Sequence, residues 1–248
     1  MSFITLYPIQ NDVLSVKKYG DNLAKVSLLS SCRVSGFEND RKLVSKSSVN
    51  KCKLYNNISR AKSRVFELAL CNPWKYWCTF TLSPEKYDRY NLKIYQKDFS
   101  EFLHSLNRNR KEKITYILIP EMHADGAWHM HGFINGLLDS DLVLNSNGYL
   151  TWKKYNNKFG YMSLSEIRDL ESTAKYSLKY MTKDSSRNVS ELGAHLYYAS
   201  HGLNSAETIY KGHGVYHGDW DWVHPDGYVR VKTLDLREIT LEECIEVL

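Results

Sequence analysis

Residues 120–133 constrain the fold of this 248-residue chain most strongly, because they combine a β-hairpin pattern with closely spaced histidines. Two extended segments flank Ala124-Asp125-Gly126, and Gly126 stands where a three-residue hairpin loop needs a left-handed residue. Directly paired residues share a face of a sheet, as do residues two apart in one strand. In this register Glu121 pairs with His129. We therefore expect four side chains to project together: Glu121, His123, His129 and His131.

Two imidazoles and a carboxylate that converge in this way predict a metal site with open coordination positions. Met130, between the two histidines of the second strand, would turn toward the core. The prediction depends on the length of the loop. A two-residue Asp-Gly loop would shift the register by one and move Glu121 and His123 to the other face. The alternative interpretation is a half-exposed hairpin with ordinary polar positions.

Composition narrows the class of protein. Hydrophobic residues make up 43% of the chain, which is typical of a globular protein. No apolar run has the length of a membrane span, no signal-peptide pattern is present, and the five cysteines include no CxxC pair. These features predict a reduced, cytoplasmic protein of a bacterial cell with no membrane partner. The sequence also lacks a P-loop, which excludes an ATPase of that type.

Positive charge is concentrated near the start of the chain. Residues 1–70 carry twelve Lys or Arg against five Asp or Glu, whereas residues 186–248 carry five against ten. A basic front segment favours a polyanion such as DNA, although a solvated basic surface explains the charge equally well. The residues that we expect to contact DNA are Arg60, Lys62, Arg64 and, further along the chain, Lys175.

The organisation of the chain is predicted in outline. Residues 1–56 form a basic N-terminal extension, residues 57–210 the main domain, and residues 211–248 a C-terminal extension that packs on the same domain. Hydrophobic periodicity and breakers predict helices over 57–70, 94–108, 165–183 and 195–210. They predict strands over 74–82, over 114–119 leading into the hairpin, and around 228–231.

The predicted helix at 165–183 carries a second chemical pattern. At 100° per residue its aliphatic side chains gather on one side, and four other side chains lie opposite them: Tyr176, Lys179, Tyr180 and Lys183. Tyrosines that belong to a core should lie with the leucines, and these two do not. Tyr176 and Tyr180 are four residues apart and therefore adjacent on one face. The alternative is a polar face with exposed tyrosines.

The metal site and the tyrosines fit one reaction. A phenolic oxygen can attack phosphorus if a cation polarises the phosphate and holds it in line. The product is a phosphotyrosine ester and a free 3′-OH. A flanking lysine can position the phosphate and offset negative charge in the transition state. Two tyrosines on adjacent turns would allow a second transfer without release of the first strand.

The chain resembles the HUH endonuclease superfamily, which includes the rolling-circle replication initiators (Rep proteins) of small plasmids and single-stranded DNA phages. Three motifs occur in the family's order over roughly residues 57–210. Phe80-Thr81-Leu82-Ser83 resembles the first motif, and His129-Met130-His131 is the second. Tyr180-Met181-Thr182-Lys183, followed by Asp184, is similar to the third.

The resemblance implies an α+β fold, with an antiparallel β-sheet flanked by helices. It implies Mn²⁺ or Mg²⁺ as the cofactor and nicking of single-stranded or hairpin origin DNA. It favours Tyr180 as the principal nucleophile and Tyr176 as the second tyrosine. Glu121 fits the family's carboxylate ligand and His123 its three-histidine version; we favour Glu121 because a hard cation prefers carboxylate oxygen.

Two other functions remain open. A mobilisation relaxase or a single-strand transposase would use the same chemistry at a different DNA site, and a non-catalytic DNA-binding module could use the same fold. Because the sequence has no P-loop, an initiator of this kind would need a host or separately encoded helicase to separate the strands. The histidines at 195, 201, 213, 217 and 224 are interpreted as surface or core residues rather than ligands.

Overall fold

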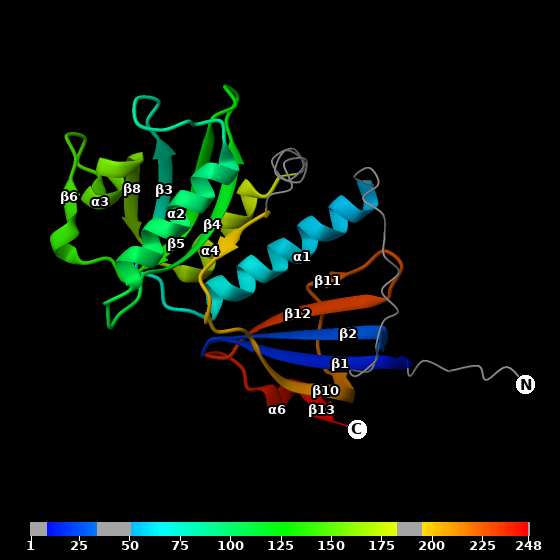
Figure 1. Ribbon diagram of the computed structural model, residues 1–248. Helices are drawn as coiled ribbons and strands as arrows, with labels where there is room; N and C mark the ends of the chain where they lie inside the picture. Colours follow the sequence, from blue (N-terminus) through cyan, green and yellow to red (C-terminus); the bar gives the residue numbers. More distant parts are fainter. Residues whose placement is uncertain (1–8, 34–50, 183–194, 248) are drawn as a thin grey trace, which may run out of the picture. The chain divides into compact units, whose positions relative to one another are not determined.

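The computed structural model describes residues 9–33, 51–182 and 195–247. The chain divides into a central unit, residues 48–204, and a terminal unit made of residues 1–47 and 205–248. Each unit contains an antiparallel sheet with helices (Figure 1), so the predicted α+β class is confirmed. The division differs from the expected boundaries at 56 and 210, because residues 205–248 form a sheet with the N-terminal strands.

The central unit is built on a seven-stranded sheet with the order β6-β7-β8-β3-β5-β4-β9 among the described residues. The predicted strand at 74–82 and the predicted hairpin are both confirmed, and they are neighbours in the middle of this sheet. The strands are β3 (Tyr76–Leu82), β4 (Thr115–Met122), β5 (Trp128–Asn135), β6 (Leu142–Leu144), β7 (Leu150–Trp152), β8 (Gly160–Glu166) and β9 (Tyr198–Ala199).

Helices cover both faces of this sheet (Figure 1). On one face Phe80 of β3 packs against Phe99 of α2, with ring centroids 5.1 Å apart. On the other face Phe133 of β5 shares a core with Val65 of α1 and Ala174 of α4. The helices of this unit are α1 (Lys51–Leu70), α2 (Leu92–Asn107), α3 (Lys153–Lys158), α4 (Leu170–Ser177) and the 3₁₀ helices η1 (Asp139–Asp141) and η2 (Leu178–Tyr180).

The terminal unit joins segments from both ends of the chain in one sheet, with the order β11-β12-β2-β1-β10-β13. Its core contains Leu14, Val26 and Leu234, which come from three different strands. Backbone pairing therefore brings together residues about 200 positions apart, as in the pair Val13 and His213. The elements are β1 (Ile9–Tyr19), β2 (Leu23–Arg33), β10 (Glu207–Tyr216), β11 (Trp222–Val223), β12 (Val229–Asp235), α6 (Leu241–Cys244) and β13 (Ile245–Val247).

Two predicted helices need correction. The predicted helix at 195–210 is wrong: the segment contains the short strand β9 and the start of β10, and Gly202 has a positive φ of 78° that a helix does not allow. The predicted helix at 165–183 begins only at Leu170, because residues 160–166 form β8 beside β3. Residues 183–194, which include the predicted site residue Lys183, lie outside the described part of the chain.

Candidate active site

The hairpin of β4 and β5 has the predicted register. Glu121 pairs with His129, and the His123 amide donates to the Ala127 carbonyl at 2.9 Å. The loop is therefore three residues long, and Gly126 has a φ of 83°, where a side chain would be strained. The Asp125 carboxylate accepts a hydrogen bond from the Ala127 amide at 3.1 Å and so stabilises the turn. The odd-length loop places the acid on the same face as the histidines of β5.

Three of the four predicted metal ligands come together. The Glu121 Oε2 atom lies 2.8 Å from the His131 Nε2 atom and 3.8 Å from the His123 Nε2 atom. One ligand atom from each of these residues falls within 4.8 Å of the others. A carboxylate with two imidazoles is a donor set that suits a divalent cation, so the residues present fit the expected metal.

His129 takes a different position from the other three. Its ring lies parallel to that of His123, with centroids 3.6 Å apart, and 6.5 Å from that of His131. It is not a member of the group whose ligand atoms lie within 4.8 Å of one another. The structure thus places His129 at the edge of the cluster and His123, which the sequence left as the reserve ligand, within it.

Two threonines of β3 hold the histidines of β5. The Thr79 hydroxyl lies 3.1 Å from Nδ1 of His131, and the Thr81 hydroxyl lies 3.1 Å from Nδ1 of His129. Each threonine is the direct cross-strand partner of the histidine that it contacts. These bonds occupy Nδ1 and leave Nε2 as the nitrogen available to a metal. Thr81 belongs to the first sequence motif, whereas the role of Thr79 was missed because the pairing of β3 with β5 could not be predicted.

Burial keeps both β5 histidines neutral. It lowers the pKa of His129 and the pKa of His131 to about 4, and the nearby His123 lowers both further when it is charged. An imidazole with so low a pKa is unprotonated at neutral pH and keeps its lone pair free. Both side chains are therefore ready to act as ligands.

The two tyrosines lie beside the cluster. The Tyr180 ring is nearly parallel to the His131 ring, with centroids 4.0 Å apart and an angle of 16°. The hydroxyls of Tyr176 and Tyr180 are 3.0 Å apart. Trp77 of β3 supports both rings at centroid distances of 5.7 and 5.9 Å. The prediction that the tyrosines share a face is confirmed, and that face looks onto the histidines.

Lys179 makes the two hydroxyls unlike each other. Its Nζ atom is 3.6 Å from the centroid of Tyr176 and 4.8 Å from that of Tyr180. Hydrogen bonding to Lys179, and then to Tyr180, lowers the pKa of Tyr176 below its ordinary value. Burial, followed by the hydrogen bond with Tyr176, raises the pKa of Tyr180 well above its ordinary value. Of the two, Tyr176 is the hydroxyl that ionises first.

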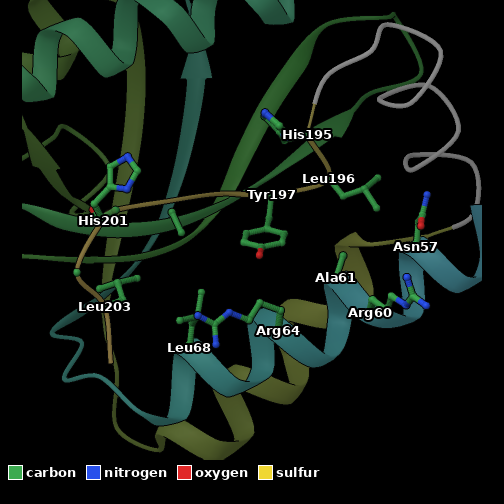
Figure 2. A pocket seen from close by; sticks show the side chains of 13 residues that line it. Asn57, Arg60, Ala61, Arg64, Leu68, His195, Leu196, Tyr197, His201 and Leu203 are labelled. Carbon is green, nitrogen blue, oxygen red and sulfur yellow. The ribbon is translucent and has the colours of Figure 1, made fainter. Parts of the chain in front are cut away.

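The residues predicted to contact DNA fall into two groups. Arg60 and Arg64 of α1 line a groove of about 660 Å³ against residues 195–203 (Figure 2). Lys62 lies on α1 but does not line this groove, and Lys175 lies on α4. The structure therefore brings together only the two arginines.

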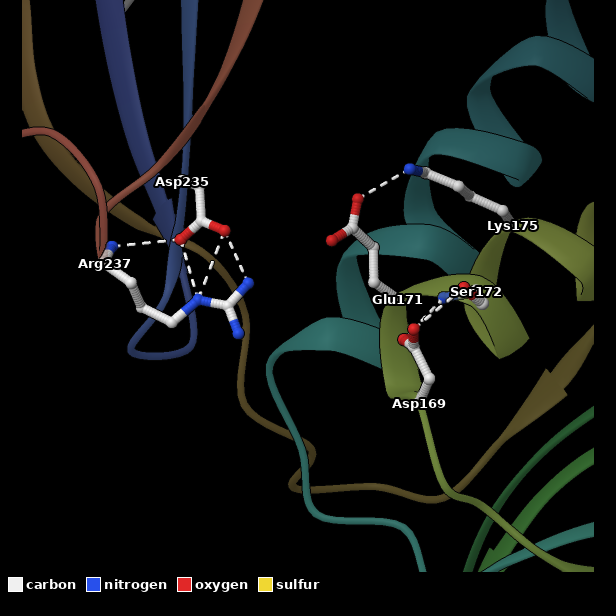
Figure 3. Close-up of polar contacts among 6 residues, drawn as sticks. All are labelled: Asp169, Glu171, Ser172, Lys175, Asp235 and Arg237. Carbon is white, nitrogen blue, oxygen red and sulfur yellow. Dashed lines mark hydrogen bonds and ion pairs between the residues drawn. The ribbon is translucent and has the colours of Figure 1, made fainter.

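A hydrogen-bonded cap fixes the start of α4 (Figure 3). The Asp169 carboxylate accepts hydrogen bonds from the Ser172 amide and the Ser172 hydroxyl, both at 3.0 Å. One turn later the Lys175 Nζ atom lies 2.6 Å from Glu171, so this lysine already has an acidic partner. The helix that carries the tyrosines is thus anchored at the end away from them.

Comparison with known proteins agrees with this geometry. Residues 75–185 match the family model of the replication-associated protein ORF2 and the gene 2 protein. These residues belong to that family. It comprises rolling-circle replication initiators of phages and plasmids, so the resemblance seen in the sequence is confirmed. No curated protein matches the chain, and no solved structure matches it. None of the helices in the described ranges is long and apolar enough to span a membrane.

Proposed function

We propose that the protein is a rolling-circle initiator that nicks single-stranded or hairpin origin DNA through a tyrosine and later religates it. The contact between the Tyr180 ring and the His131 ring, at 4.0 Å, carries this proposal. It places a phenol next to an imidazole whose other neighbour is a carboxylate, 2.8 Å away. Family membership supports the same activity.

Glu121, His131 and His123 would hold Mn²⁺ or Mg²⁺, with His129 as a neighbouring imidazole. A divalent cation supplies a Lewis acid that polarises the scissile phosphate. The chain itself orients the ligands: Thr79 and Thr81 fix the rings of the two β5 histidines through Nδ1. Of the two candidates for the third ligand, Glu121 is favoured because its carboxylate oxygen lies 2.8 Å from the Nε2 atom of His131.

In the proposed reaction the Tyr180 oxygen forms a bond to phosphorus while the bond from phosphorus to the 3′ oxygen breaks. The phenol loses its proton and the leaving 3′ oxygen gains one, which yields a 5′-phosphotyrosine and a free 3′-OH. Tyr176 accepts a hydrogen bond from Tyr180 and stands closest to the Lys179 ammonium. It is the residue placed for the second transfer, and Lys179 offsets negative charge on the phosphate. Lys183 keeps its predicted supporting role.

The proposed partner is origin DNA. Opening a duplex origin requires energy from a nucleoside triphosphate, and the sequence contains no P-loop. We therefore propose that a host or separately encoded helicase works with the protein. Lys62 and Lys175 remain predicted DNA contacts.

The test uses overlapping single-stranded oligonucleotides that cover both strands of the replicon encoding the protein, each labelled at its 3′ end. With Mn²⁺, one oligonucleotide should give a labelled protein adduct in a denaturing gel, and EDTA should abolish it. Mass spectrometry should locate the adduct on Tyr180 or Tyr176.

Variants complete this test. Tyr180→Phe should remove most of the adduct, and the Tyr176→Phe/Tyr180→Phe pair should remove all of it. Tyr149→Phe, at an exposed tyrosine of the same unit, is the matched control and should react normally. A persistent adduct in the double variant, or cleavage without any adduct, would rule out the proposed reaction.

A further inference from the structure

The groove between α1 and residues 195–203 has an unusual lining. Two arginines, two histidines and a tyrosine contribute to a space of about 660 Å³, and no carboxylate lines it. Figure 2 shows α1 forming one wall and the segment with Tyr197 forming the other. This volume is within the range of roughly 300–1,000 Å³ found for ligand sites. The lining favours an anion.

The α1 wall presents its polar side chains as one stripe. Asn57, Arg60 and Arg64 follow one another at intervals of three and four residues, which places them on one side of the helix. Arg60 is exposed and makes no ion pair within the described part of the chain. Arg64 lies 3.0 Å from Glu67. A guanidinium has five N–H donors, so this single contact leaves Arg64 able to bind a phosphate as well.

The opposite wall is held in place at both ends. At one end β9 pairs with β4, and the Tyr116 amide donates to the Ser200 hydroxyl at 2.9 Å. At the other end Asn72 and Asn204 exchange two hydrogen bonds of 2.9 and 2.8 Å. A wall fixed in this way keeps the groove open without a ligand.

Tyr197 supplies the aromatic element. In Figure 2 its ring stands in the middle of the groove with the hydroxyl directed toward α1. That hydroxyl makes no hydrogen bond among the residues that the structure describes. A basic groove combined with an aromatic side chain is the arrangement that binds single-stranded nucleic acid without reading its sequence.

The groove is linked to the tyrosine helix through α1. Ala61 lines the groove and also belongs to the core that contains Ala174 and Met181, which flank the tyrosines in sequence. That core lies on the face of the sheet that carries Glu121 and the β5 histidines. A strand held in the groove and a phosphate presented to the tyrosines therefore lie on one side of the central unit.

We infer that this groove binds the sugar–phosphate backbone of the single strand that adjoins the nick. Arg60 and Arg64 hold two successive phosphates, and the Tyr197 hydroxyl donates to the backbone between them. This inference rests on the proposed function for its choice of DNA. It adds a second binding site, which anchors the strand while the hairpin site acts on it.

Binding to the full chain tests the inference, measured by fluorescence anisotropy in EDTA so that nicking plays no part. The probe is a single strand, with a duplex of the same sequence for comparison. The Arg60→Ala/Arg64→Ala variant should weaken single-strand binding about tenfold. It should lower the slope of log K against log salt by about 1.4, because each phosphate contact on a single strand contributes roughly 0.7.

Matched variants separate the groove from general charge. Lys93→Ala/Lys97→Ala removes the same charge from α2, on the other face of the sheet, and should leave the slope unchanged. Arg60→Lys/Arg64→Lys should restore the slope. Tyr197→Phe should weaken binding a few-fold with the slope intact. Equal slope changes in the arginine and lysine pairs, or an equal change with the duplex, would overturn the inference.

Cleavage kinetics separate this inference from the proposed function. With Mn²⁺ and saturating DNA, the Arg60→Ala/Arg64→Ala variant should keep the wild-type kcat and show a raised KM. A lowered kcat at unchanged KM would overturn the anchoring role. If the wild-type protein cleaves no DNA, the proposed function fails, while the binding comparison in EDTA still decides the groove.

Discussion

The metal hairpin and the arginine groove lie in the same unit but depend on different properties of the chain. At the hairpin, function depends on atoms placed by strand register, such as the 2.8 Å contact between Glu121 and His131. In the groove, two exposed guanidiniums one helical turn apart act through charge. The hairpin should therefore respond to the removal of single atoms, whereas the groove should respond mainly to the removal of charge.

The largest effect is expected at the carboxylate. Glu121→Gln keeps the shape of the side chain but removes its charge, and it should abolish measurable Mn²⁺ binding in calorimetry. The rate of adduct formation should fall on the order of 10³-fold, because a bound cation stabilises the transition state by several kcal/mol. Glu85→Gln, at an exposed acid of the same unit, should have no effect. Mn²⁺ affinity within twofold of wild type would show that Glu121 is not a ligand.

A smaller effect is expected at the threonines behind the histidines. Thr79→Val and Thr81→Val remove one hydroxyl each and keep the shape of a strand residue. Loss of the bond to Nδ1 should lower Mn²⁺ affinity by about 10–100-fold. Ser163→Ala is the control, because Ser163 faces Thr79 from the other neighbouring strand. Unchanged affinity in both threonine variants would mean that the register alone orients the rings.

The hairpin could be predicted from the sequence because its determinants are local. Ala124-Asp125-Gly126 fixes the loop length, and the loop length fixes which residues share a face. The order of the motifs then brought the tyrosines to the same site. Their contact with His131 could not be derived, because it depends on the 3₁₀ turn at 178–180 that ends the helix.

The groove and the terminal sheet could not be predicted, because both depend on pairing between distant segments. Arg60 and Arg64 were expected to bind DNA, but their partner Tyr197 lies in a segment predicted to be helical. Alternation in that segment is short, and β9 has only two residues. The strand pairs of the terminal unit join residues about 200 positions apart, which hydrophobic periodicity does not reveal.

Acidity should leave the hairpin site almost unchanged over a range where ordinary histidines would fail. Because the pKa of His129 and that of His131 are lowered to about 4, protons compete with a metal only as the pH approaches that value. Mn²⁺ affinity should therefore change by less than about twofold between pH 7 and pH 5.5. Histidines with an unshifted pKa of about 6.5 would lose roughly tenfold each over the same range. Calorimetric titration at several pH values measures this, and a loss of that size would show that the rings are not buried.

The smallest effect is expected at the cap of the tyrosine helix, where a local hydrogen bond acts on a distant site. Asp169→Ala removes the acceptor for the Ser172 amide and should lower the melting temperature by a few degrees. The amide bond lowers the pKa of Asp169, so the cap stabilises the fold at neutral pH and loses this effect as the carboxylate is protonated in acid. Asp169→Asn keeps an acceptor and should retain most of the stability. If loosening the cap displaces Tyr180 from His131, adduct formation slows while single-strand binding in the groove stays constant. Equal losses of both would mean that hairpin and groove respond as one element, and the distinction between a positioned site and a charged one would not hold.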